Sequence, residues 1–198
     1  FFGHGSGNYI SAELGARRHD NAERMAATGF ACSFLCGLLF MILGLIFVEP
    51  LSMLLGSTPT ILPYTKQYLG ISLIGIPFFT SSLTLNNQMR FQGNASRSMF
   101  GIVTGAILNV GLDPLFIFVF NMGVAGAALA TVIGQVCSFL ILLYLSRQPG
   151  NIAIRPRLFT PTKAMFKEIF YGGSPSLNRQ GLAALSTLLL NLAAGGWG

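Results

Sequence analysis

Residues 108–118, LNVGLDPLFIF, place an aspartate and a proline inside an otherwise apolar run. An acid within a hydrocarbon layer costs about 2.5 kcal/mol or more on insertion scales, so it normally faces a partner or a cavity and marks an ion or proton path. The other acids lie in loops or at the ends of apolar runs: Glu13, Asp20, Glu23, Glu49 and Glu168. Asp113 is therefore the acid whose position needs an explanation.

The composition around this run is that of a membrane protein. Of the 198 residues, 52% are hydrophobic and 9% are charged, whereas soluble domains carry about 25% charged residues. A helix needs about 20 apolar residues to cross a bilayer. Such runs occur at 25–47, 65–86, 99–120, 124–145 and 166–194. We expect an all-α integral membrane protein with these five spans, and residues 1–10 could be the tail of an earlier span.

The basic residues predict the orientation, because cytoplasmic loops are enriched in Lys and Arg. Ten of the 12 Lys and Arg residues lie in or beside three alternate connections, 15–24, 87–98 and 146–165. The intervening connections, 49–64 and 121–124, contain none. We expect the three basic connections to be cytoplasmic. The formal charge of +6 is then explained by topology, and no nucleic-acid partner is expected.

The longest connection predicts a boundary between two groups of helices. It reads SRQPGNIAIRPRLFTPTKAMFKE and contains three prolines. We expect residues 1–145 to form an amino-terminal transmembrane bundle that lacks its first helix, 146–165 a cytoplasmic linker, and 166–198 the first helix of a second bundle. Because the chain starts at Phe1 and stops just after an apolar run, we expect a fragment. A plain cytoplasmic connector is the simplest interpretation of the linker.

Oxygen atoms accompany Asp113 on its predicted helix. Asn109 lies four residues earlier and therefore on the same helical face. Pro114 cannot donate a hydrogen bond to the carbonyl of Val110, which can leave that oxygen free. Such a patch suits Na⁺, a hard cation, or a proton on the carboxylate. An Asp that is simply hydrogen-bonded between helices is the alternative.

Small residues predict that the next helix packs closely against this one. GIVTG (101–105) is a GxxxG motif, and GAALATVIG (126–134) carries a small residue at every fourth position. Rows of this kind let membrane helices approach closely. We therefore expect Thr131 to come within reach of Asp113, with Gln135 on the same face as Thr131.

Arg179 is a second charge deep in a predicted span. It follows GGSP (172–175), which we interpret as a helix breaker. The side chain could contact a substrate or a counter-ion, or it could pair with a group outside the chain.

The sequence contains no motif that indicates enzyme chemistry. GHGSG (3–7) lacks the Gly-Lys-Ser/Thr ending of a phosphate-binding loop. Neither His4 nor His19 is accompanied by a Ser or Cys in a triad-like arrangement. We therefore expect no enzymatic activity and no cofactor.

Three stretches resemble the multidrug and toxin extrusion (MATE) transporters, within the larger group that includes polysaccharide and lipid-linked precursor flippases. They are GSGNYISAELGARRHDNAERMA, LNNQMRFQGNASRSM and LNVGLDPLFIFVFNMGVAGAALATVIGQ. The third is the most specific, since Asn, Asp-Pro and Gly-Val-Ala-Gly-Ala-Ala occur together at the family's spacing. GNYISAELGA is similar to the MepA-like multidrug branch.

The resemblance implies two six-helix bundles, alternating access, and export of cationic or amphipathic drugs in exchange for Na⁺ or H⁺. The chain would run from the end of the second helix through the seventh of twelve. The family's cation site maps onto Asn86, Asn109, Asp113 and Thr131, with one further Asp on the first helix, outside the chain.

Several further expectations follow for the complete transporter. It would be a monomer in the plasma membrane, with the lipid bilayer and small-molecule substrates as partners and the ion as its only co-substrate. Gln135 and Arg179 could line the substrate cavity. Some branches carry a coupling acid on the seventh helix, but here no acid lies beyond Glu168 in that span.

Two other functions remain open at this point. A flippase or exporter of lipid-linked or polysaccharide precursors would be favoured by a cavity lined with several basic residues. A channel subunit or scaffold without transport would tolerate neutralisation of Asp113.

Overall fold

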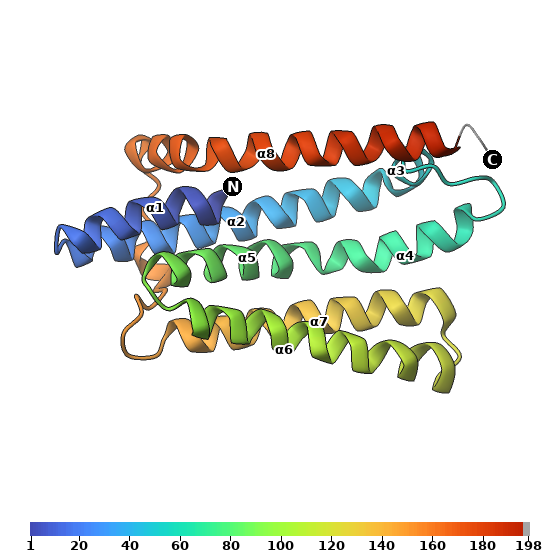
Figure 1. Ribbon diagram of the computed structural model, residues 1–198, viewed down its shortest axis with the longest axis horizontal. Coiled ribbons are helices and arrows are strands. Elements are labelled where there is room, and N and C mark those ends of the chain that lie inside the picture. Colours follow the sequence, from blue (N-terminus) through green and yellow to red (C-terminus); the bar gives the residue numbers. More distant parts are fainter. Residues whose placement is uncertain (196–198) are drawn as a thin grey trace.

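A computed structural model describes residues 1–195 as a bundle of elongated helices (Figure 1). The all-α fold predicted from composition is confirmed. In chain order the elements are α1 (Phe2–Gly15), α2 (His19–Ile46), α3 (Val48–Leu54), α4 (Leu62–Ile74), α5 (Ile76–Phe91), α6 (Ala95–Pro114), the π-helix η1 (Leu115–Val119), α7 (Gly123–Ser146), the 3-10 helix η2 (Pro156–Leu158) and α8 (Lys163–Gly195).

Four of the five predicted spans correspond to helices suited to a membrane. Within the described chain, α2, α6 continued through η1, and α7 are each long and apolar enough to cross a bilayer. Helices α4 and α5 make a fourth span if they are taken together, with a bend of 48° between them. Gly75 and Pro77 lie at this bend, and proline bends a helix because it lacks an N–H donor.

The fifth predicted span, 166–194, is one continuous helix, but it does not meet the same test of apolarity. Its polar run Asn178-Arg179-Gln180 lowers its hydropathy. The interpretation of GGSP (172–175) as a breaker is wrong, since α8 continues through Pro175. The glycines of GGSP instead pack against the start of the chain and α1.

Helix α8 packs closely against α1 through glycines on both helices. A Cβ added at Gly5 would overlap the carbonyl oxygen of Ile169, and one added at Gly172 would lie 3.1 Å from the Cα of Gly5. Gly173 lies against the ring and carbonyl of Phe1. Small residues permit this backbone approach, so the two glycines of GGSP serve the contact of α8 with α1.

The three basic connections gather at one end of the bundle (Figure 1). They are the α1–α2 turn, the α5–α6 turn and the α7–α8 connection. The α3–α4 and η1–α7 connections lie at the opposite end (Figure 1). Positive charge is therefore segregated to one end, as the alternation of basic and neutral loops along the sequence implies.

The α7–α8 connection is docked across that end of the bundle rather than free. The backbone N–H of Ile152 donates to Gln92 Oε1 at 2.8 Å. Asn94 Nδ2 donates to the carbonyl of Gly150 at 2.9 Å and also to the side chain of Asn151. The connection is thereby fastened to the α5–α6 turn.

Two isoleucines of the connection complete separate hydrophobic clusters. Ile152 packs in a cluster formed by α1, α2 and α8, which includes Ile10 and Met25. Ile154 packs with Leu85 and other residues of α5 and α7. The connection therefore joins the α1–α2–α8 side of the bundle to the α5–α7 side.

Ile154→Ala should destabilise the protein markedly. Ile154 is 5% exposed, and truncation of a buried Ile to Ala typically costs about 2–5 kcal/mol. We expect a lower midpoint of thermal unfolding for the purified full-length transporter. Phe159→Ala, in the same connection but 38% exposed, should have a smaller effect. Equal shifts for the two variants would contradict the packing described for Ile154.

Candidate cation site

The site forms where α6 and α7 approach most closely. A Cβ added at Gly105 would lie 2.6 Å from the carbonyl oxygen of Gly134, and one added at Gly134 would lie 2.8 Å from that of Gly105. Real Cβ atoms do not reach such distances, so the two backbones touch at glycines. The close approach predicted from the small residues is confirmed.

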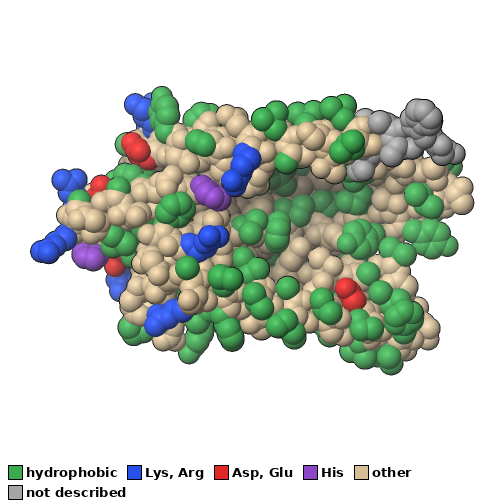
Figure 2. All heavy atoms as spheres, in the orientation of Figure 1, with side chains coloured by type: hydrophobic (Ala, Val, Ile, Leu, Met, Phe, Trp, Pro, Cys, Tyr) green, Lys and Arg blue, Asp and Glu red, His purple; other side chains and the backbone are tan. Residues whose placement is uncertain are grey.

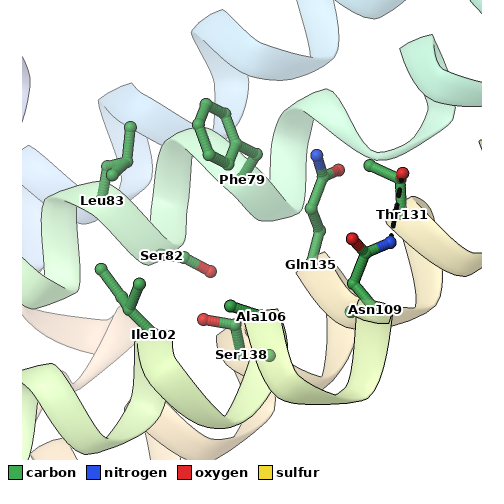
Figure 3. A pocket seen from close by; sticks show the side chains of 11 residues that line it. Phe79, Ser82, Leu83, Ile102, Ala106, Asn109, Thr131, Gln135 and Ser138 are labelled. Carbon is green, nitrogen blue, oxygen red and sulfur yellow. Dashed lines mark hydrogen bonds between the residues drawn. The ribbon is translucent and has the colours of Figure 1, made fainter. Parts of the chain in front are cut away.

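This approach brings Asn109 and Thr131 together, as Figure 3 shows. Asn109 Nδ2 donates to Thr131 Oγ1 at 3.3 Å, and the threonine hydroxyl donates in turn to the carbonyl of Ala127 at 3.0 Å. A hydroxyl has a single proton, so Thr131 acts as the acceptor toward Asn109. With its amide N–H₂ turned to Thr131, Asn109 presents its carbonyl oxygen to the pocket beside it.

A pocket of about 210 Å³ lies beside this pair, between α5, α6 and α7. Figure 3 shows Gln135 and Ser82 directed toward it together with Asn109. Ser82 Oγ and Gln135 Oε1 are buried, and neither has a hydrogen-bond partner among the described residues. The pocket is therefore largely apolar in its lining but contains two buried oxygens without partners.

Asp113 lies one helical turn beyond Asn109, at the end of α6. Its Oδ1 is buried and has no hydrogen-bond partner among the described residues. Asp113 is not among the residues that line the 210 Å³ pocket. Thr131 hydrogen-bonds Asn109 rather than Asp113 in this structure. Asp113 and the Asn109–Thr131 pair thus occupy successive turns along the same helix pair.

The backbone changes its winding immediately after Asp113. Residues Leu115–Val119 form a π-helix, in which the N–H of Phe120 bonds the carbonyl of Leu115 at 3.1 Å. Pro114 begins this change because it cannot donate within an α-helix. π-helical turns occur frequently at functional sites. Pro114 is visible in the sequence, but the sequence did not predict the π-helix at Leu115–Val119.

Asn86 does not join Asn109 and Thr131 in this pocket. Its side chain is buried, and Nδ2 donates to the carbonyl of Ser98 at 2.9 Å, which fastens α5 to the start of α6. It lines another pocket, of about 430 Å³. Its role in cation binding stays a prediction. Ser82, one turn earlier, is the polar α5 residue beside Asn109, and the sequence offered no signal for it beyond its spacing.

The two residues predicted for a substrate cavity lie in different places. Gln135 lines the 210 Å³ pocket. Arg179 is exposed on α8, and its neighbour Gln180 lines the 430 Å³ pocket. The structure therefore separates Arg179 from the Asn109–Thr131 pair.

Residues 1–115 match the MatE family, which is more than half of the chain. The chain is 31% identical over 192 residues to the "Multidrug export protein MepA" of Staphylococcus haemolyticus (strain JCSC1435), covering 96% of this chain and 42% of that protein. A protein of the same name from Staphylococcus saprophyticus is 31% identical over 198 residues, covering 100% and 44%. The chain thus spans less than half the length of these relatives.

Solved structures of related transporters share the fold. An inward-facing multidrug resistance MATE family transporter of the MOP superfamily superposes with a TM-score of 0.83, at 29% identity, over 97% of this chain and 42% of that one. An outward-facing conformation gives a TM-score of 0.86 at 28% identity over 98% and 43%. With its apolar helices, the chain is a membrane protein, and its relatives are transporters rather than enzymes. The chain belongs to the MatE family of multidrug and toxin extrusion transporters and is MepA-like.

Proposed function

We propose that the transporter containing this chain exports cationic or amphipathic drugs in exchange for Na⁺ or H⁺, with Asp113 as the coupling group. The observation that carries the proposal is the buried Asp113 Oδ1, which has no hydrogen-bond partner among the described residues. Asp113 lies one turn of α6 beyond Asn109, which is paired with Thr131 of α7. The relatives named as multidrug exporters support the class of substrate.

The chemistry of Asp113 explains how an ion could bias the transporter. A carboxylate in an apolar region is stabilised either by a proton or by a cation. Either ligand neutralises the charge, and a ligand that binds one conformation better shifts the population toward it. Asp113 would then alternate between an ion-bound state and a state competent to export a drug.

Asn109 and Thr131 suit the binding of Na⁺ better than they would suit a proton alone. Carboxylate, amide and hydroxyl oxygens are ligands of hard cations. Asn109 and Asp113, one helical turn apart on α6, are the residues that we assign to Na⁺, while Thr131 orients the Asn109 amide through its hydrogen bond. A proton would need Asp113 alone.

We also propose that the end of the bundle bearing 15–24, 87–98 and 146–165 faces the cytoplasm, and that the membrane is the plasma membrane. The segregation of basic loops to one end supports this orientation. This orientation is tested with single cysteines introduced at Arg17 and at Ser57. Their accessibility to a membrane-impermeant reagent is compared in intact cells and in everted vesicles.

The function is tested with the full-length transporter in proteoliposomes loaded with a fluorescent cationic dye such as ethidium. We expect dye movement when a Na⁺ gradient or a pH gradient is imposed, and the effective gradient identifies the ion. Equal dye movement with and without a gradient would refute drug–ion exchange. The absence of dye movement under both the Na⁺ gradient and the pH gradient would refute it as well.

Thr131→Val should weaken ion coupling without abolishing it. Valine keeps the shape of threonine but cannot accept the hydrogen bond from Asn109. Loss of a group that orients a ligand typically costs about 10–100-fold in ion affinity. We expect the ion concentration for half-maximal dye export to rise by at least about tenfold. Thr104→Val, which removes a hydroxyl bonded within α6 to Phe100, is the matched control and should leave it unchanged.

A further inference from the structure

Nitrogen-bearing side chains surround a pocket other than the one beside Asn109 and Thr131. His4 of α1 and Arg90 of α5 line the 430 Å³ pocket together with Gln180 of α8. His4 and Arg90 also line an adjoining pocket of about 260 Å³, with Asn87. Three helices thus direct nitrogen-bearing side chains to one place.

Arg179 adds a second guanidinium to this group. Arg179 is exposed and directly precedes Gln180 on α8, so its guanidinium extends from the helix segment that Ser176 and Gln180 hold against His4. Ser176, one turn before Gln180, joins the helices here, because its Oγ lies 3.5 Å from His4 Nδ1 and accepts from Gln180 Nε2 at 3.4 Å. Figure 2 shows Lys or Arg and His side chains gathered beside a hollow in this face.

No carboxylate within residues 1–195 neutralises this group. The ion pairs found in that part of the chain join Glu13 to Arg18 and Glu49 to Lys66. Both pairs lie at helix ends, away from His4, Arg90 and Arg179. Among the described residues, the Arg90 and Arg179 guanidinium groups therefore have no ion-pair partner.

The position of Arg179 makes this charge significant. Arg179 comes 16 residues after Lys163, the first residue of α8, or about 24 Å along the helix. Its neighbour in this group, Arg90, lies in the last turn of α5, within the basic connection 87–98, so the group lies toward the end of the bundle where the basic loops gather. A cationic drug would be repelled by two guanidinium groups, so the partner expected here is an anion.

We propose that His4, Arg90 and Arg179 form a binding site for a phosphate group, either on an anionic lipid headgroup or on a soluble phosphate. Guanidinium groups bind phosphate through paired, charge-assisted hydrogen bonds, which Lys or Gln cannot reproduce. The His4 ring and the Asn87 and Gln180 amides supply further donors. Asn86 lines the same 430 Å³ pocket, but the site shares no residue with Asp113, Asn109 and Thr131, so phosphate binding and ion coupling can be measured separately.

The full-length transporter in nanodiscs tests the site, with thermal unfolding as the readout. In one arm, phosphatidylglycerol replaces part of the phosphatidylcholine; in the other, inorganic phosphate is added to phosphatidylcholine nanodiscs at constant ionic strength. We expect one of these ligands to raise the unfolding midpoint of the wild type in a saturable way. Arg90→Gln and Arg179→Gln should each weaken the apparent affinity by about tenfold or more.

Two further variants make the result decisive. Arg179→Lys keeps the charge but loses the paired geometry, so its affinity should fall between those of the wild type and Arg179→Gln. Arg24→Gln removes an exposed arginine of α2, a helix that contributes no cation to this group, and should leave the affinity unchanged. Stabilisation by lipid alone assigns the phosphate to a headgroup, and stabilisation by inorganic phosphate assigns it to a soluble anion. If the unfolding midpoints of the wild type, Arg90→Gln and Arg179→Gln respond equally to the ligands in both arms, the proposal is overturned.

Discussion

Asp113→Asn should abolish gradient-driven export of a cationic dye, down to the rate of vesicles without transporter. Asparagine is close in size to aspartate but cannot bind a proton in the relevant range, and it offers no charge to Na⁺. The ion would then have no differential affinity for the two conformations, and a ligand without differential affinity shifts no equilibrium. Dye efflux from proteoliposomes under the effective gradient measures the change.

The interpretation of this variant depends on separating lost coupling from lost folding. We expect Asp113→Asn to retain its unfolding midpoint and its binding of dye in the absence of a gradient. Glu49→Gln is the matched control: it removes another carboxylate, which lies in α3 and pairs with Lys66 at 2.8 Å, and exposed pairs of this kind contribute little. Full export by Asp113→Asn at equal expression would assign Asp113 a structural role and move the search for coupling to the rest of the transporter.

Two glycines of the same helix should respond to alanine with opposite signs. A Cβ at Gly105 would lie 2.6 Å from the carbonyl oxygen of Gly134 and 2.7 Å from Ser138 Cβ, whereas at Gly111 it would meet nothing within 4 Å. Gly105→Ala therefore has to separate α6 from α7, and overpacking of this kind costs about 1–3 kcal/mol. Gly111→Ala should stabilise the helix by about 0.5–1 kcal/mol.

The midpoints of thermal unfolding of the purified full-length variants provide the measurement. Gly105→Ala should also impair ion-coupled export, since separation of α6 and α7 lengthens the 3.3 Å contact between Asn109 and Thr131. Gly111→Ala leaves that contact in place and should export normally. A decrease of similar size in both variants would indicate that helix propensity, rather than contact between the backbones, governs this helix pair.

Features carried by a local pattern could be predicted from the sequence. Apolar runs of sufficient length identified the spans that became α2, α4–α5, α6–η1 and α7. The small residues at 101–105 and 126–134 predicted the contact of α6 with α7, because spacing of three and four residues places side chains on one face. The same reasoning predicted Thr131 within reach of Asp113, whereas in the structure Thr131 accepts a hydrogen bond from Asn109.

Features that depend on distant segments could not be predicted in this way. Ile152 and Ile154 lie in a proline-containing loop with no periodicity, and only packing shows that each completes a different cluster. GGSP (172–175) reads as a breaker in isolation, but α1 lies against it and uses its small residues for contact. A local pattern cannot report which neighbour will cover it.

By itself, the sequence determined that this chain is a helical membrane protein with basic residues in alternate loops and a costly acid at position 113, because hydropathy, charge and helical period are local properties. Only the tertiary structure decided that Asn109 pairs with Thr131 and that Ser82 and Gln135 share their pocket. It also decided that His4, Arg90 and Arg179 converge from three helices. Side chains far apart in the chain meet only when the helices pack, since the backbone approach at glycines sets which faces touch.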